Sequence, residues 1–300
     1  MRNLFAVVVL GGVYSFCMAL ALLALDAVDV SMTEASVGAG VSTVLLLGTL
    51  YLTHTTEAPA LKVRVGPLVV ALATGALVVY GAFGLPPFGE AAAPIHQHVA
   101  PRYINDVVRE TGVPNIVTAV LASYRGYDTF GETTVVFTAG LGVLILLQGR
   151  LREAEKEILV GSMHEETVPR VVIKLILPFI LLFGLYVFYH GESGPGGGFQ
   201  AGVILAAGVI LYGVIFGLTA ARRIVPMRLL EIAIPLGVFI YGAVGVAGLL
   251  FGGNFLDYFV LDKDPVHGQE RGIFWVETGV LVTVAGTMAA IYYAFSGRGR

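Results

Sequence analysis

Apolar residues along this chain form eight long stretches separated by short polar segments. A helix rises about 1.5 Å per residue, so about 20 apolar residues are needed to cross a hydrocarbon layer of about 30 Å. Each stretch meets or approaches that length, and the pattern therefore predicts an all-α, polytopic membrane protein with about eight transmembrane helices. The predicted spans are 4–25, 30–52, 67–83, 128–147, 171–189, 198–220, 229–251 and 273–295.

Composition supports this class. Of the 300 residues, 56% are apolar and only 13% are charged, and the mean hydropathy is +0.83. Soluble domains carry about twice that share of charge, so a water-soluble enzyme and a disordered chain are both excluded. The net charge of −3 gives nucleic-acid binding no electrostatic basis. The single cysteine, Cys17, allows no disulfide within the chain.

The basic residues indicate an orientation. With both termini in the cytoplasm, eight spans place twelve Lys and Arg residues in inner segments and five in outer segments. This excess agrees with the positive-inside rule. A signal peptide is the alternative for the first stretch, since Arg2 precedes it. The stretch is longer than a normal signal core and the next span follows directly, so we expect a retained helix.

Two polar segments divide the chain further. The segment 148–170 separates four spans with polar interruptions from four more uniform ones, and is predicted to form an amphipathic helix along the inner surface. The outer segment 85–126 contains an apolar piece, 116–122, that is too short to span and is expected to form an interfacial or re-entrant helix.

The second span carries acidic residues near its outer end. Ionisable groups within a membrane are costly and normally face protein or water. Glu34 lies one turn inside this span, Asp29 precedes it, and small residues such as Ser36 and Gly38 follow, which allow close helix packing. A carboxylate in such a contact can hold or relay a proton. The alternative is a rim acid hydrated at the headgroup level.

Three further spans carry charged residues. Arg125, Asp128 and Glu132 share one helical face, where an Arg–Asp pair would leave Glu132 the deepest and least compensated acid. The alternative is an interfacial ion pair that anchors the helix. Glu277 lies one turn inside the last span, at the rim or on an ion pathway. Lys174 lies near the inner end of the fifth span, where extension to the surface competes with a relay role.

The connection between spans five and six is rich in glycine. It lacks the Lys-Ser/Thr pair of a phosphate-binding loop. Non-helical backbone at membrane depth must be buried in protein or line water. His190 and Glu192 are therefore candidates for a proton or cation inlet, with a simple tight turn as the alternative. The candidate residues of this loop are His190, Glu192, Pro195, Gly196, Gly197, Gly198, Phe199 and Gln200.

Motifs for other chemistry are missing from the sequence. His96 and His98 supply only two potential metal ligands, and no zinc-type spacing occurs. No nucleophile–base, nucleotide-binding or haem-attachment motif is present. We therefore expect no resident metal or cofactor, and a protein that is not an enzyme.

These motifs resemble a known family. The run from His190 to Gln200 resembles the signature of the MnhB domain, the B component of Mrp-type multisubunit Na⁺/H⁺ antiporters, as does the late Glu277-Thr-Gly-Val. The run 29–40 resembles MbhD-like regions, and 125–132 resembles MbhE-like regions. In this family both regions usually lie at the C-terminal end of the large A component, and they occur as separate subunits in membrane-bound hydrogenases.

The resemblance implies a fusion of these parts. The MbhD-like region would cover 1–66, the MbhE-like region 67–150, a cytoplasmic linker 151–170 and the MnhB-like domain 171–300. It implies a transporter subunit in a bacterial or archaeal cell membrane, carrying Na⁺ and H⁺. The implied partners are the large A and D subunits, the small C, E, F and G subunits, and membrane lipids. Glu34 and Glu132 match the acids of the family motifs.

Two other functions remain open on the sequence. One is a membrane-arm subunit of a redox-driven ion pump related to membrane-bound hydrogenases, whose companions would carry iron–sulfur clusters. The other is a structural scaffold, in which the acids only hold subunits together.

Overall fold

A computed structural model of the chain describes residues 3–52, 55–57, 65–87, 89–154 and 167–297. Within these ranges all regular elements are helices, apart from an isolated bridge between Asn3 and Thr56. Eight helical segments are long and apolar enough to cross a membrane, which confirms the predicted fold class and number of spans. They are Leu4–Ala24, Val28–Leu50, Val65–Ala82, Gly126–Leu147, Thr167–His190, Gly198–Phe216, Met227–Leu250 and Pro265–Ser296.

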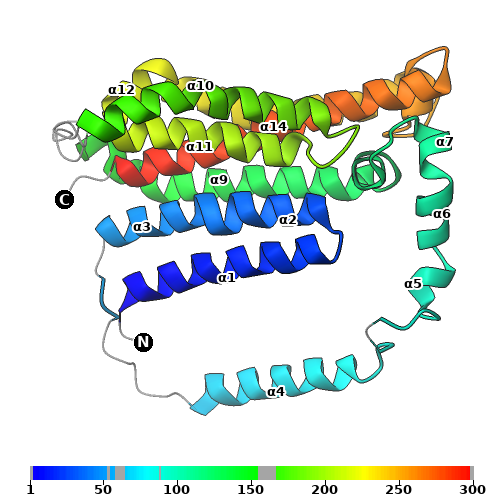
Figure 1. Cartoon of the computed structure of the whole chain (residues 1–300), viewed down its shortest axis with the longest axis horizontal. Helices are drawn as coiled ribbons and strands as arrows, with labels where there is room; N and C mark the ends of the chain where they lie inside the picture. Colours follow the sequence, from blue (N-terminus) through cyan, green and yellow to red (C-terminus); the bar gives the residue numbers. More distant parts are fainter. Residues whose placement is uncertain (1–2, 53–54, 58–64, 88, 155–166, 298–300) are drawn as a thin grey trace.

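The elements follow one another as Figure 1 labels them. The N-terminal part contains α1 (Leu4–Ala24), α2 (Val28–Glu34), the π-helical segment η1 (Ala35–Ser42), α3 (Thr43–Leu52) and α4 (Val65–Ala82). The outer segment forms α5 (Pro94–Gln97), α6 (Ala100–Asn105), α7 (Val107–Thr111), α8 (Ile116–Ala119) and the π-helical η2 (Val120–Tyr124). The rest contains α9 (Gly126–Ala154), α10 (Thr167–His190), α11 (Gly198–Phe216), α12 (Leu218–Ile224), α13 (Met227–Leu250), the 3₁₀ helix η3 (Tyr258–Leu261) and α14 (Pro265–Ser296).

Helix α14 is the centre of the bundle. It packs against α13, α11 and α9, while α10 covers the other side of α11 (Figure 1). Small residues allow α13 and α14 to approach closely, since a Cβ added at Gly279 would lie 2.6 Å from the carbonyl oxygen of Gly237. Such contacts replace the hydrophobic effect, which does not drive helices together within lipid.

The first two spans form a layer beside this bundle. Helix α1 packs against α2, η1 and α3, and η1 also contacts α11. The Ser31 hydroxyl donates to the carbonyl oxygen of Ala19 at 2.7 Å, which joins the two spans near their connection. The layer thereby places the acidic end of α2 against the bundle.

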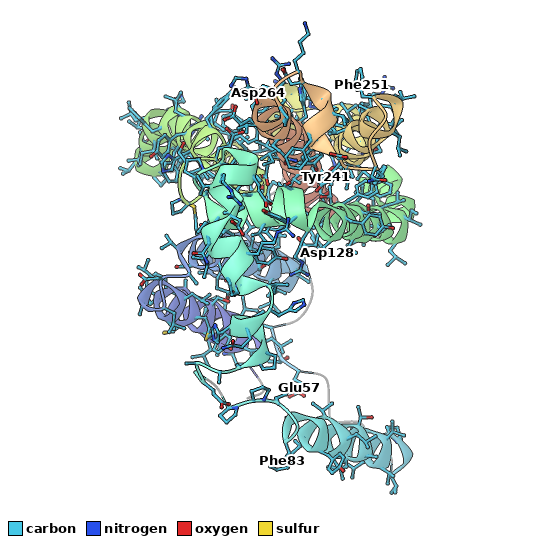
Figure 2. All side chains as sticks on the ribbon, turned by 90° about the vertical axis from the view of Figure 1, so that its right-hand side faces the viewer. Glu57, Phe83, Asp128, Tyr241, Phe251 and Asp264 are labelled. Carbon is cyan, nitrogen blue, oxygen red and sulfur yellow. The ribbon has the colours of Figure 1, made fainter. Side chains whose placement is uncertain are left out.

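Helix α4 stands apart from the bundle. None of its residues is buried, and α5, α6 and α7 run from its end to the bundle as a column (Figure 1). Figure 2 shows Phe83, just after α4, far from Asp128 and Tyr241 in the bundle. Its apolar surface is therefore free to contact lipid or other helices.

Most boundaries differ from the prediction by a few residues, and the largest difference is at the eighth span, which begins at Pro265 rather than at residue 273. The sixth span ends at Phe216 rather than at residue 220, because Gly217 has φ +90° and starts the separate helix α12. The fourth span continues as one helix to Ala154, so the start of the predicted amphipathic segment belongs to α9. Residues 155–166 of that segment lie outside the described ranges.

The beginning of α1 and the end of α14 lie at the same end of the molecule (Figure 1). An even number of spans requires this arrangement. That this end faces the cytoplasm stays a prediction from the distribution of basic residues.

Candidate functional site

The backbone of Gly196–Gly198 connects three helices at the end opposite the termini. Its three consecutive amides each donate a hydrogen bond to a different element. The acceptors are Asp29 Oδ1 in α2 (3.1 Å), the Val187 carbonyl in α10 (3.1 Å) and the Glu277 carboxylate in α14. The glycine-rich loop is therefore a junction between helices rather than a simple turn.

Glycine is required at this junction for two reasons. Gly196 and Gly197 have φ values of +156° and +124°, which side-chain-bearing residues rarely adopt. A Cβ on Gly197 would also lie 3.0 Å from Glu277 Oε2. The conformation and the close approach together explain the glycine run.

Asn115 fastens the outer segment to the same loop. Its Nδ2 group donates to Asp29 Oδ1 at 3.3 Å, to the Gly191 carbonyl at 3.0 Å and to the Gly194 carbonyl at 2.7 Å. Its Oδ1 atom accepts from the Val117 amide and caps α8. The sequence interpretation missed this residue, although an Asn before an apolar helical run is a typical N-cap signal.

A cavity of about 380 Å³ is lined in part by this junction, through Asp29, Gly196 and Glu277. Its wall is mostly apolar, with three carboxylates from three separate spans: Asp29, Glu132 and Glu277. Asp29 is buried, whereas Glu132 is exposed at the rim. The remaining lining residues are Val30, Thr33, Val117, Thr118, Leu121, Thr129, Thr133, Val136, Phe199, Gln200, Val280 and Val284.

A smaller pocket of about 40 Å³ is also lined by this loop, through Gly191, Glu192 and Gly197, and we call it the outer pocket after the predicted orientation. Glu192, half-buried in the loop, is one of its walls, and Glu277 and Thr118 line both hollows. Burial is the main cause that raises the pKa of the Glu192 carboxyl above its usual range, and the nearby charge of Glu270 adds to it. The remaining walls are Phe188, Tyr189 and Phe274.

Glu34 lies on a different side of its span. It does not line either hollow but faces α1, where its Oε1 atom lies 2.8 Å from the position that a Cβ on Gly38 would occupy. The Ser15 side chain of α1 reaches the same position. The structure therefore separates Glu34 from Asp29, Glu132 and Glu277.

The other predicted residues are also accounted for. Asp128 is exposed and forms an ion pair with Arg125 at 2.6 Å. Lys174 is exposed on α10, with its Nζ atom 5.8 Å from the centre of the Phe216 ring.

His190 stacks on Tyr186 with ring centroids 5.0 Å apart, outside both hollows. Pro195 is half-buried and precedes the three donating amides, while Phe199 and Gln200 line the larger cavity.

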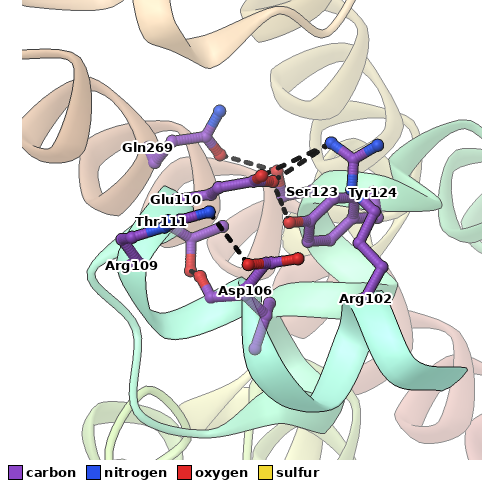
Figure 3. A network of polar contacts seen from close by, with 9 residues as sticks. Arg102, Asp106, Arg109, Glu110, Thr111, Ser123, Tyr124 and Gln269 are labelled. Atoms are coloured by element: carbon purple, nitrogen blue, oxygen red, sulfur yellow. Dashed lines mark hydrogen bonds and ion pairs between the residues drawn. The ribbon is translucent and has the colours of Figure 1, made fainter.

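A polar network holds the outer segment over this end of the bundle (Figure 3). The Tyr124 hydroxyl donates to the Glu110 carboxylate, and this bond is the main cause that holds the pKa of Glu110 below its usual range. Arg102 pairs with the same carboxylate at 3.3 Å. The Ser123 hydroxyl donates to Gln269 of α14 at 2.6 Å. These residues lie outside the hollows and position the segment that carries Asn115.

The described residues also show how far potential metal ligands lie from one another. Among the described residues, no group of three or more His, Cys, Asp or Glu side chains is close enough to hold a metal ion. In general, a carboxylate holds a proton in its neutral form and attracts a cation in its charged form.

Comparison with known families assigns each part of the chain. Residues 168–290 match the family model described as a domain related to the MnhB subunit of Na⁺/H⁺ antiporter. Residues 1–55 match the model MbhD, for the D subunit of MBH, and residues 63–165 match MbhE, for its E subunit. Asp29, Glu132 and Glu277 thus come from three different matched segments.

Curated relatives agree with this assignment. The chain is 26% identical over 264 residues to the probable A/B subunit of a K⁺/H⁺ antiporter from Rhizobium meliloti strain 1021, covering 77% of this chain and 26% of that protein. It is 30% identical over 140 residues to the putative antiporter subunit mnhB2 of Staphylococcus haemolyticus strain JCSC1435, covering 45% of this chain and 96% of that protein. The chain therefore spans about a quarter of the first relative and nearly all of the second.

Solved structures show the same fold. The chain superposes over its whole length on a third of one chain in the Mrp complex from Dietzia sp. DQ12-45-1b, with a TM-score of 0.78 and 26% identity. A chain of the archaeal membrane-bound sulfane sulfur reductase matches over 97% of its own length and 78% of this chain, with a TM-score of 0.56 and 29% identity.

The fold and these matches define the class as a polytopic helical membrane subunit of the Mrp type. Within that class, the chain belongs to the family of MnhB antiporter subunits, here preceded by segments related to MbhD and MbhE.

Proposed function

We propose that this chain is an integral membrane subunit of a multisubunit antiporter that exchanges a monovalent cation for protons. The observation that carries the proposal is the cavity of about 380 Å³. One hollow is built from all three matched segments, and each segment contributes one carboxylate. A cavity wall with carboxylates from all three segments favours an ion path over a purely structural contact between independent segments.

The chemistry of the path follows from its carboxylates. A protonated carboxyl is neutral and can line an apolar cavity at a low cost in free energy. An ionised carboxylate attracts a cation. Alternation between these states lets one site serve both ions in turn. Na⁺ is the first cation to test and K⁺ the second, because the relatives' names include both. The ions are transported, so the proposal requires no resident cofactor.

The exposed surface supports assembly with other membrane subunits. Glu132 lies exposed at the cavity rim, and an unpaired acid facing lipid would be costly. Helix α4, free of buried residues, offers a further apolar face. We propose the large A and D subunits, the small C, E, F and G subunits, and lipid as the surrounding partners, in a bacterial or archaeal cell membrane with both termini in the cytoplasm.

The test is antiport in everted membrane vesicles that contain the complete complex. Addition of Na⁺ or K⁺ should dissipate an imposed pH gradient, as read by an acridine dye, in vesicles with the intact chain. Vesicles from a strain lacking only this chain should show no such response. Equal cation-dependent responses in both would contradict the proposal.

The structural similarity to the sulfane sulfur reductase favours a second candidate, a membrane-arm subunit of a redox-driven pump. Mass spectrometry of the complex purified in mild detergent separates the two. Membrane subunits alone support the antiporter, whereas iron–sulfur proteins would identify the redox complex.

A further inference from the structure

The two hollows of the candidate site meet at one titratable side chain. We propose that Glu277 is the gate through which protons pass between the outer pocket and the membrane cavity, with Glu192 at the outer inlet. The inference rests on the proposed function and assigns one of its two ions to this route.

The position of Glu277 is the first step of the argument. Two described residues with polar side chains line both hollows, Glu277 and Thr118. The Thr118 hydroxyl donates to the Gly191 carbonyl at 2.7 Å and does not titrate. A proton that moves from one hollow to the other therefore reaches Glu277 as the shared acid–base group.

The surroundings of Glu277 allow both of its charge states. No basic side chain is among the described residues that line either hollow. The Gly198 amide, at the N-terminus of the 19-residue helix α11, donates to the Glu277 carboxylate and favours the charged form. The partial burial of Glu277 opposes that form. The two effects act in opposite directions, as a group that repeatedly gains and loses a proton requires.

Further groups face Glu277 from the surrounding elements. Its charge interacts with those of Glu192 in the loop and Asp29 in α2. Glu132 of α9 lines the same cavity, and the hydroxyls of Tyr241 and Tyr258 also interact with Glu277. Every titratable group in this set is an acid, so protonation of one makes ionisation of its neighbours easier.

The volume of the outer pocket favours the passage of protons over that of hydrated cations. A water molecule needs a hollow of at least about 10–15 Å³, so about 40 Å³ admits only a few waters. A cation with its full shell of waters does not fit, and it would have to lose most of those waters, at a high cost in free energy, to enter. The cavity of about 380 Å³ is large enough for a fully hydrated cation. The cost of losing water favours protons over cations in the outer pocket, and we assign the pocket to the proton, with the cation entering the cavity by another route.

The proton transfer between these groups is balanced. Water beside Glu192 in the outer pocket gives a proton to the Glu277 carboxylate, forming the neutral acid, and Glu192 restores that water with a proton from outside. Glu277 then releases its proton to water in the larger cavity and returns to the carboxylate. No oxidant, reductant or bond other than O–H is involved.

The experiment uses the complete complex with Glu277→Gln, Glu277→Asp and Glu192→Gln. Glu231→Gln, which changes an exposed acid outside both hollows, is the matched control. Cation-dependent proton flux should fall at least about 100-fold in Glu277→Gln, the scale of a lost acid–base group, and recover partly in Glu277→Asp. The amount of assembled complex should not change. Wild-type flux in assembled Glu277→Gln would overturn the inference.

A second readout does not depend on flux. Dicyclohexylcarbodiimide reacts with protonated carboxyls in apolar surroundings, and peptide mass spectrometry locates the label. We expect label at Glu277 that decreases as pH rises, with the midpoint shifted to lower pH in Glu192→Gln because a like charge is removed. Absence of label, or an unchanged midpoint, would overturn the gate. Wild-type vesicles without cation-dependent flux would instead overturn the proposed function, and labelling would still test the gate.

Discussion

Asp29 Oδ1 accepts hydrogen bonds from the Gly196 amide at 3.1 Å and from Asn115 Nδ2 at 3.3 Å, although Asp29 and Gly196 are 167 residues apart. One buried carboxylate thus joins the second span, the outer segment and the glycine-rich loop. A group in this position shapes the cavity as well as lining it, which gives it a testable structural role.

Removing this junction should destabilise the protein. Hydrogen bonds to a charged group contribute about 1.5–3 kcal/mol each, so Asp29→Ala and Asn115→Ala should each lower the midpoint of thermal unfolding in detergent. The double variant should lose less than the sum, with a coupling of about 0.5–3 kcal/mol. Glu90→Ala, at an exposed loop position, is the control. Additive effects would show that the two residues act separately.

Gly197→Ala should disturb the junction through the backbone. A non-glycine residue in such a conformation costs about 1–3 kcal/mol, and the new methyl group would press on Glu277. We expect a lower unfolding midpoint and reduced cation-dependent proton flux. Gly75→Ala makes the same chemical change inside α4, with no atom within 4 Å of the new Cβ, and should lower neither the midpoint nor the flux. Similar results for the two variants would contradict the role assigned to the loop.

Stability should depend on the ionisation of Glu192. Burial and Glu270 raise its folded-state pKa above the ordinary value of about 4.3, so the folded state holds the proton more tightly than the unfolded chain. Between those two pKa values, stability falls as pH rises, and above the folded pKa the loss is complete. Glu192→Gln removes this dependence. Its unfolding midpoint relative to wild type should therefore rise with pH across that interval, whereas Glu90→Gln should follow wild type.

Glu34→Gln should greatly reduce antiport while the complex still assembles. An acid held within a span against Ser15 and Gly38 is costly, and acids retained in membranes at such a cost usually belong to an ion path, here one separate from the cavity of Asp29, Glu132 and Glu277. The measurement is cation-dependent proton flux beside quantification of the complex. Glu57→Gln, at an exposed position after the second span, is the comparison. Normal flux in Glu34→Gln would remove this residue from the pathway, and loss of assembly would assign it to the interface with α1.

Much of the architecture can be predicted from the sequence. The number of spans follows from the length of the apolar stretches, because the hydrocarbon thickness sets one minimum length for every helix. The special backbone of the glycine-rich loop can also be predicted from the sequence. Consecutive glycines before a helix indicate backbone conformations that other residues rarely adopt. Both features depend on local chemistry.

The composition of the site depends on which face each helix turns to its neighbours. Asp29 and Glu34 are five residues apart, and a helix of 3.6 residues per turn separates them by about 140° around its axis. Packing against α1 and the loop places Asp29 at the cavity and Glu34 at Ser15. Hydrophobic pattern cannot decide this, because both faces of a membrane helix are apolar. The meeting of Asp29, Glu192 and Glu277 around one loop joins positions far apart in the chain, and only the folded bundle brings them together.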